Sequence, residues 1–290
     1  MTRDLNTAGG AATSDLLRAM SRRTALKAGA LGAVGTMVGG SLFSALQAET
    51  KHRRSHGDFR EPDEVTPAEQ IFTIAQDAEQ LAVTLYSRGV ANGLGLADDD
   101  LDYFKAAAIQ EQIHQKFFAR LTGVKVQKPN HFSFPEGPDT FTDLRTWIIA
   151  QQHLEGVFDT AFLAAVRELA HQGMPRAAQI MAQIATNEAE HRVLAREVAA
   201  GEGFTTLPNI NPGGHGTVPT SPPDNWAYTP VFVEAVPDVV ELATRDGFMS
   251  PRPGNNFEYH EIDFHSPTYS DVFERLMFLE PFINVHEDDD

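Results

Sequence analysis

The stretches EQIH, residues 111–114, and EAEH, residues 188–191, each place a glutamate and a histidine three positions apart. A lone glutamate precedes each stretch: Glu79 lies 32 residues before the first and Glu155 lies 33 residues before the second. In a helix, residues i and i+3 share one face, so each pair can reach the same metal ion. Two such pairs and one glutamate from each of two further helices form the ligand set of a dinuclear metal site.

Four segments have the apolar periodicity of long helices, with the candidate ligands on their inner faces. They cover residues 66–92, 98–122, 140–172 and, after a break at 173–175, residues up to about 200. The connections are short, long and short, and the long one, 124–139, contains three prolines. This order predicts an all-α four-helix bundle, made of two helical hairpins joined by a long crossover.

The candidate ligands are four carboxylates and two imidazoles: Glu79, Glu111, His114, Glu155, Glu188 and His191. Oxygen and imidazole nitrogen donors suit iron or manganese, and we expect two metal ions, iron first and manganese as the alternative. Four carboxylates balance most of the charge of two divalent ions, so the site can lie inside an apolar core.

A third Glu-x-x-His pair, Glu168 with His171, does not fit this arrangement. Glu168 comes 13 residues after Glu155, which is roughly 220° around the same helix. We therefore expect this pair to face away from the site and to be solvated.

Other side chains lie near the ligands by helical spacing. Tyr86 follows Glu79 by seven residues and is a candidate catalytic group that could relay an electron; a core tyrosine with a bonded hydroxyl is the alternative. Gln152 and Asp159 stand three before and four after Glu155, where hydrogen bonds to ligands commonly originate. Trp147 is expected in the core and His153 in solvent.

Composition excludes several functions. The 290 residues contain no cysteine, so disulfides, thiolate catalysis and iron–sulfur clusters are excluded. The formal net charge of -17 argues against nucleic-acid partners and against anionic membrane surfaces. The expected partners are instead a small-molecule oxidant or ferrous iron.

The amino terminus has the pattern of an export signal. Arg22 and Arg23 precede an uncharged stretch at 28–48 that is rich in glycine and alanine. Residues 1–48 are therefore predicted to be a twin-arginine-type signal peptide, followed by a flexible leader at 49–65. The protein would be periplasmic or extracellular, and bound to the membrane only if the signal stays uncleaved.

Residues 203–290 change in character, with many prolines, glycines and aromatics. Short helices are predicted near 231–246 and 268–279 in an otherwise irregular extension. We expect this extension to wrap the bundle or to join a partner subunit in a homo-oligomer. His260, Glu261, Asp263 and His265 are a weaker candidate for a second metal site.

These motifs resemble exported ferritin-like domain proteins, the group that includes plant and bacterial desiccation-related proteins. The resemblance covers roughly residues 66–202 and rests on EQLA at 79–82, EQIH at 111–114, LEGV at 154–157 and EAEH at 188–191. It implies a ferritin-like di-iron carboxylate bundle with the six residues as ligands, in which Glu111 or Glu188 can bridge.

The sequence leaves two functions open. The first is an oxidoreductase that handles dioxygen, peroxide or ferrous iron. Without cysteine it has no rubredoxin-like electron donor of its own, whereas a catalase-like reaction needs none. The second is a non-catalytic stress or desiccation protein that keeps a metal pair for stability.

Overall fold

The computed structural model describes residues 65–123, 130–210, 216–220 and 233–281. The predicted signal and nearly all of the predicted leader lie outside these ranges, as does the acidic end of the chain. Among the residues that are described, no helix combines the length and the apolar character that a membrane span needs.

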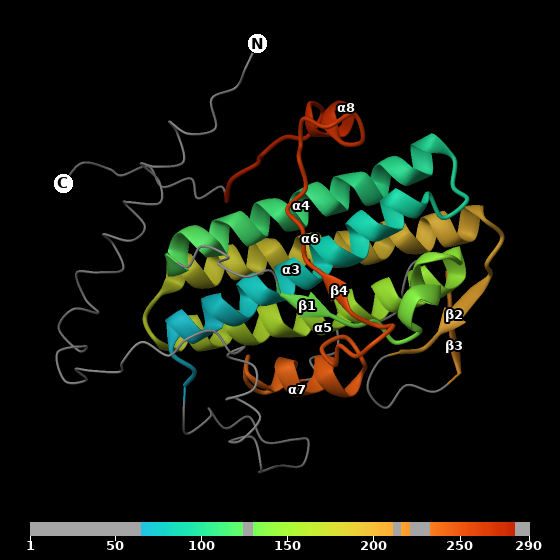
Figure 1. Ribbon diagram of the computed structural model, residues 1–290. Helices are drawn as coiled ribbons and strands as arrows, with labels where there is room; N and C mark the ends of the chain where they lie inside the picture. Colours follow the sequence, from blue (N-terminus) through green and yellow to red (C-terminus); the bar gives the residue numbers. More distant parts are fainter. Residues whose placement is uncertain (1–64, 124–129, 211–215, 221–232, 282–290) are drawn as a thin grey trace.

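Four long helices form the body of the protein: α3 (Ala68–Asn92), α4 (Asp98–Thr122), α5 (Leu144–His171) and α6 (Pro175–Gly201). α3 packs along α4, and α5 packs along α6; the two hairpins meet through α3 with α5 and through α4 with α6. Figure 1 shows the four helices running alongside one another. The prediction of an all-α bundle of two hairpins is confirmed.

The helix ends follow from the residues at them. Gly93 and Gly123 adopt left-handed backbone angles, φ 69° and φ 66°, which end α3 and α4. The third helix begins later than the predicted residue 140. Gly137–Phe141 form the short 3-10 helix η1, and the Asp143 side chain then caps α5 by accepting a hydrogen bond of 2.8 Å from the Thr146 amide.

The C-terminal extension is tied to the crossover by a short antiparallel pair of strands, β1 (His131–Phe132) and β4 (Phe257–Glu258). Asn255 reinforces this link, because its side chain both accepts from the Phe134 amide and donates to the Phe134 carbonyl. A second pair, β2 (Thr206–Pro208) with β3 (Thr217–Pro219), follows α6. The extension therefore wraps its own bundle (Figure 1).

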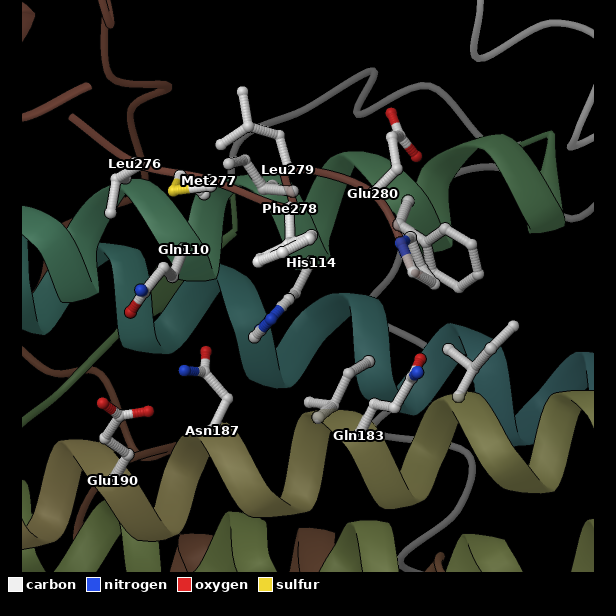
Figure 2. Close-up of a pocket in the computed structure, with 15 residues that line it drawn as sticks. Gln110, His114, Gln183, Asn187, Glu190, Leu276, Met277, Phe278, Leu279 and Glu280 are labelled. Atoms are coloured by element: carbon white, nitrogen blue, oxygen red, sulfur yellow. The ribbon is translucent and has the colours of Figure 1, made fainter. Parts of the chain in front are cut away.

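The extension has less helix than the sequence predicts. α7 covers Asp238–Arg245, with Pro237 at its N-cap, and α8 is a single turn, Ser270–Phe273. Phe278 adopts φ 56°, which a right-handed helix does not permit, so the chain beyond α8 runs as an irregular segment. Residues 276–281, named here the strap, border a pocket together with α4 and α6, and Figure 2 shows His114 among the residues that line it.

Glu168 corrects one prediction, since its side chain is only 1% exposed. Its carboxylate accepts a hydrogen bond from the Thr66 amide before α3 and another from the Val236 amide before α7. Glu168 does turn away from the metal ligands, as its helical angle requires. It faces the C-terminal extension, however, and not solvent.

α3 and α5 come close together where Gly89 faces Trp147. A Cβ at position 89 would lie 2.5 Å from Trp147 Nε1, so a larger residue would have to displace the indole. Trp147 is fully buried, as expected, and its Nε1 donates to the Leu85 carbonyl at 3.3 Å. This contact fixes the spacing of the two helices that carry Tyr86 and Glu155.

Candidate metal centre

The six candidate ligands project into the centre of the bundle from four different helices. α3 carries Glu79 and α5 carries Glu155, while α4 and α6 each carry a Glu-x-x-His pair. Because each pair spans one helical turn, its two side chains leave the helix on the same face. The structure thus brings together all six candidate ligands: Glu79, Glu111, His114, Glu155, Glu188 and His191.

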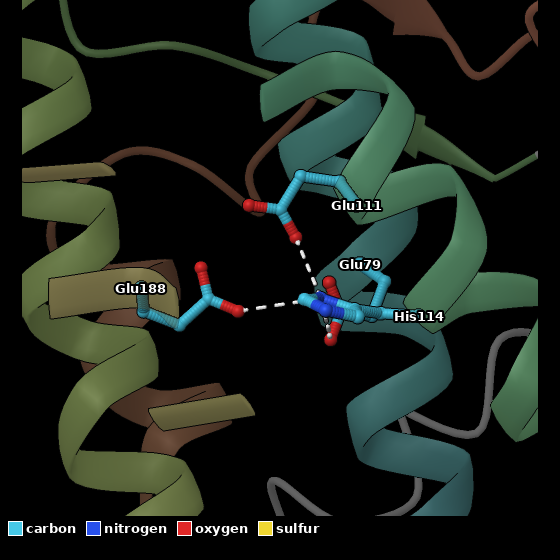
Figure 3. Close-up of side chains that lie close together, drawn as sticks. All are labelled: Glu79, Glu111, His114 and Glu188. Carbon is cyan, nitrogen blue, oxygen red and sulfur yellow. Dashed lines mark ion pairs between the residues drawn. The ribbon is translucent and has the colours of Figure 1, made fainter. Parts of the chain in front are cut away.

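One half of the centre is formed around His114 (Figure 3). Its Nδ1 lies 3.6 Å from Glu79 Oε1, 3.4 Å from Glu111 Oε2 and 3.5 Å from Glu188 Oε1. One ligand atom from each of these four residues lies within 4.8 Å of the others. Such a cluster can surround one metal ion.

The other half is formed around His191. Its Nδ1 lies 2.9 Å from Glu111 Oε1, 3.2 Å from Glu188 Oε2 and 3.4 Å from Glu155 Oε1. These four residues form a second group that meets the same 4.8 Å limit. Within the described residues, these two groups are the ones that could hold a metal ion, and both belong to this centre.

Glu111 and Glu188 belong to both halves and use different oxygens in each. Glu111 turns Oε2 toward His114 and Oε1 toward His191, while Glu188 turns Oε1 toward His114 and Oε2 toward His191. A carboxylate that offers one oxygen to each of two neighbouring ions is a bridging ligand. Glu79 and Glu155 each contact only one half, which is the arrangement of terminal ligands.

The polar atoms of the centre fit a bound cation. Both oxygens of Glu79 and of Glu111, together with His114 Nδ1, are buried without a hydrogen bond. Leaving buried polar atoms unpaired costs free energy, and ionised carboxylates cost most. Metal ions would satisfy these atoms and neutralise the carboxylates at the same time.

Burial and the close approach of the charged groups also shift their pKa values. Burial raises the carboxyl pKa of Glu79 and of Glu155 well above its ordinary value, and neighbouring carboxylates add to the shift. Burial opposes ionisation of Glu111 too, yet contacts with Glu79, His114 and His191 hold its pKa low. Burial lowers the pKa of both imidazoles, but the carboxylates around them outweigh it and raise each pKa. Protons and bound cations would therefore compete for the same carboxylate and imidazole atoms.

Hydrogen bonds from outside the ligand set orient the His191 half. His191 Nε2 lies 2.7 Å from Gln110 Oε1, which leaves Nδ1 to face the carboxylates. The Tyr86 hydroxyl donates to Glu155 Oε1 and accepts from Gln151 Nε2 at 2.8 Å. Burial raises the pKa of Tyr86, so the phenol keeps its proton.

Two predicted partners of the ligands bond elsewhere. Gln152 Nε2 donates to Gln151 Oε1 at 2.7 Å and to the Arg192 carbonyl at 2.9 Å. Asp159 pairs with Arg192 at 2.9 Å. Sequence reasoning instead missed Gln110 and Gln151. Each stands four residues before a candidate ligand, His114 or Glu155, so helical spacing could have found them.

The remaining histidine predictions come out differently. His153 was expected in solvent, but it is half-buried and its Nε2 lies 3.0 Å from Asp246 Oδ2, because the extension covers this face of α5. The weaker metal candidate at 260–265 does not assemble: Glu261 pairs with Lys116 at 3.5 Å, and Asp263 accepts from the His265 amide. The described residues hold no metal group there.

Comparison with known proteins agrees with this architecture. A family model described as the ferritin-like domain matches residues 68–201, which span α3 to α6. The comparisons with curated proteins and with solved structures gave no match. The residues that match the model of the ferritin-like domain are thus the same ones that carry the buried carboxylate and histidine cluster, which could hold metal ions.

Proposed function

We propose that this protein holds two metal ions, iron or manganese, and acts as an oxidoreductase on dioxygen, peroxide or ferrous iron. The observation that carries the proposal is the sharing of Glu111 and Glu188 between two ligand groups, with a different oxygen of each turned to each half. A single structural ion would not need a second histidine group. The donor set of carboxylates and imidazoles suits iron and manganese.

Each residue then has a role. Glu79 with His114 and Glu155 with His191 would hold one ion each, and Glu111 and Glu188 would bridge. Two reduced ions held by these residues would be able to supply two electrons to an oxidant. His191 is kept in its orientation by Gln110.

Tyr86 is the candidate for proton and electron movement. Its hydroxyl donates to Glu155, so a proton can pass between the phenol and this carboxylate without rearrangement. Gln151 holds the hydroxyl in place from the other side. The Tyr86 ring lies 5.5 Å from the Trp147 ring, so a second oxidisable aromatic stands behind it.

The location of this activity is a proposal from the sequence alone. Arg22, Arg23 and the uncharged stretch after them support export of the protein by a twin-arginine route. That route would place the metal centre outside the cytoplasm.

The proposal is tested by loading the metal-free protein anaerobically with Fe²⁺ or Mn²⁺, and by then adding dioxygen or hydrogen peroxide. We expect two ions per chain, followed by a change in absorption and consumption of the oxidant. A Glu188→Ala variant is the control, because it lacks a shared ligand. Two bound ions that give no spectral change with either oxidant would contradict the oxidoreductase and leave a metal-stabilised, non-catalytic protein.

A further inference from the structure

The pocket beside His114 has a volume of about 380 Å³. Its walls are α4, α6 and the strap, residues 276–281. Figure 2 shows His114 directed from α4 toward α6, with Asn187 and Glu190 directed from α6 into the same space. The pocket therefore leads from the surface to one edge of the metal centre.

Only one half of the centre borders this pocket through its histidine. The His114 side chain is 15% exposed and is part of the lining, whereas that of His191 is 1% exposed and is not. A molecule in the pocket would thus lie next to the His114 half. It would have no contact with His191.

The lining is mainly apolar. Nine of its fifteen residues are hydrophobic or proline: Ile113, Phe117, Ile180, Ile184, Leu276, Met277, Phe278, Leu279 and Pro281. Asn187 adds an amide group that can hydrogen-bond a ligand, and so does the amide nitrogen of Gln110, whose oxygen faces His191. No lysine or arginine lines the pocket, and of its two acids Glu280 is paired with Arg120 at 2.7 Å, which leaves Glu190. An anionic ligand would therefore find no lysine or arginine in the lining to balance its charge, and Glu190 would repel it.

The pocket is much larger than dioxygen or peroxide needs, so its size indicates that it holds a larger molecule. Dioxygen and peroxide are close in size to water, which needs about 30 Å³. A volume of several hundred Å³ with apolar walls and a few polar groups is typical of sites for small organic molecules. The strap also keeps Met277 and Phe278 74% and 78% exposed at the mouth, and it holds Phe278 at a φ that residues other than glycine seldom adopt.

We propose that this pocket binds a small, uncharged organic substrate with an apolar body and a hydroxyl group, next to the His114 half of the centre. This inference rests on the proposed function and supplies the electron donor that the cysteine-free chain lacks. Oxidation of such an alcohol breaks its O–H bond and the neighbouring C–H bond and forms a carbonyl. The two electrons and two protons released are taken up by dioxygen, which becomes hydrogen peroxide.

The test uses the full chain loaded with two Mn²⁺ ions and the probe naphthalene-2-methanol, with 2-naphthoate as its anionic counterpart. Binding is followed by the fluorescence of the naphthalene ring. Asn187→Trp fills the pocket from a half-buried position on α6. Thr186→Trp is the matched control, because Thr186 is exposed and does not line the pocket.

We expect the wild-type protein and Thr186→Trp to bind naphthalene-2-methanol with equal affinity, and Asn187→Trp to bind it at least tenfold more weakly. The wild-type protein should also bind 2-naphthoate at least tenfold more weakly than it binds naphthalene-2-methanol. Should Asn187→Trp fail to fold, Phe278→Ala removes a mostly exposed wall of the pocket and should weaken binding several-fold. Equal binding by all variants, or equal affinity for the anion, would overturn the proposal.

Metal content separates this inference from the proposed function. If the wild-type protein takes up no metal in equilibrium dialysis, the proposed function fails. If it takes up two ions and does not bind the alcohol, only the pocket inference fails. If Asn187→Trp slows metal uptake while the alcohol binds as before, the pocket is an entry route for ions, and the substrate proposal is wrong.

Discussion

The two halves of the metal centre are built from the same motif but have different surroundings. His114 borders a pocket, and its Nδ1 has no hydrogen bond. His191 is closed off from solvent, with its Nε2 bonded by Gln110 and its ring centre 5.7 Å from that of Tyr86. The difference comes from what covers each helix. The strap leaves a pocket over α4 beside His114, whereas side chains of the bundle enclose His191.

We infer from this contrast that the two halves of the centre have different roles. The His114 half is the one that an incoming molecule can approach. The His191 half, with Gln110, Tyr86 and Gln151 around it, is suited to hold its ion firmly and to exchange protons.

The largest effect is expected from removing a shared ligand. Glu111→Ala should weaken metal binding in both halves by at least about 100-fold, more than the 10–100-fold typical of losing a ligand's hydrogen-bond partner. Glu79→Ala should weaken only the His114 half, because Glu79 belongs to one group. Equilibrium dialysis with elemental analysis measures both. A Glu111→Ala variant that keeps two ions would contradict the ligand assignment.

Metal affinity should rise with pH. Burial raises the carboxyl pKa of Glu79 and Glu155, and the carboxylates raise the pKa of both imidazoles, so the metal-free centre holds protons that an ion must displace. Each displaced proton makes the affinity about tenfold lower per pH unit on acidification. Calorimetric titrations at several pH values, in buffers of different ionisation enthalpy, count these protons. An affinity that does not change with pH would show that the centre is already deprotonated.

The sealed half is tested through Gln110. Gln110→Leu removes the hydrogen-bond partner of His191 Nε2 and should lower metal affinity about 10–100-fold in that half alone. Asn187→Leu is the control, since Asn187 lines the same pocket and contacts neither histidine in the hydrogen bonds of the structure. If both variants lost metal affinity equally, the effect of Gln110 would come from its place in the lining of the pocket and not from its hydrogen bond to His191.

Tyr86→Phe should have the smallest effect on metal binding, less than about tenfold, because the hydroxyl bonds the candidate ligand Glu155 and is not itself a candidate ligand. Stopped-flow absorption should nevertheless show a slower reaction with dioxygen or peroxide, since the variant lacks the proton of the phenol. Metal content measured in the same samples is the control. An unchanged rate would assign Tyr86 a purely structural role as a core tyrosine.

The bundle could be predicted because its signals are local. Helical periodicity placed Glu79 and Tyr86 on one buried stripe and Glu188 and His191 on another, and all four are buried. Glycines at helix ends marked where α3 and α4 stop. The meeting of the six ligands then followed from the order of short and long connections.

The contacts of the extension could not be predicted in the same way, because they join residues far apart in the chain. Glu168 was expected in solvent because its angle on α5 points away from the ligands. The chain around Val236, which lies 68 positions later, covers it instead. His153 was also expected in solvent, but it pairs with Asp246, which is likewise far from it in the chain. The strap forms one wall of the pocket beside His114. The path of the strap could not be read from a periodic pattern, because Phe278 leaves the right-handed helical conformation there.

Glu111 and Glu188 are proposed to join two metal ions in one centre. To test this, the metal-free protein is loaded with Mn²⁺, and its electron paramagnetic resonance spectrum is recorded together with its metal content. We predict two Mn²⁺ per chain and the multiline spectrum of a magnetically coupled pair, which Glu111→Ala should lose. One ion per chain, or only the six-line spectrum of isolated Mn²⁺ at full loading, would contradict a shared dinuclear centre.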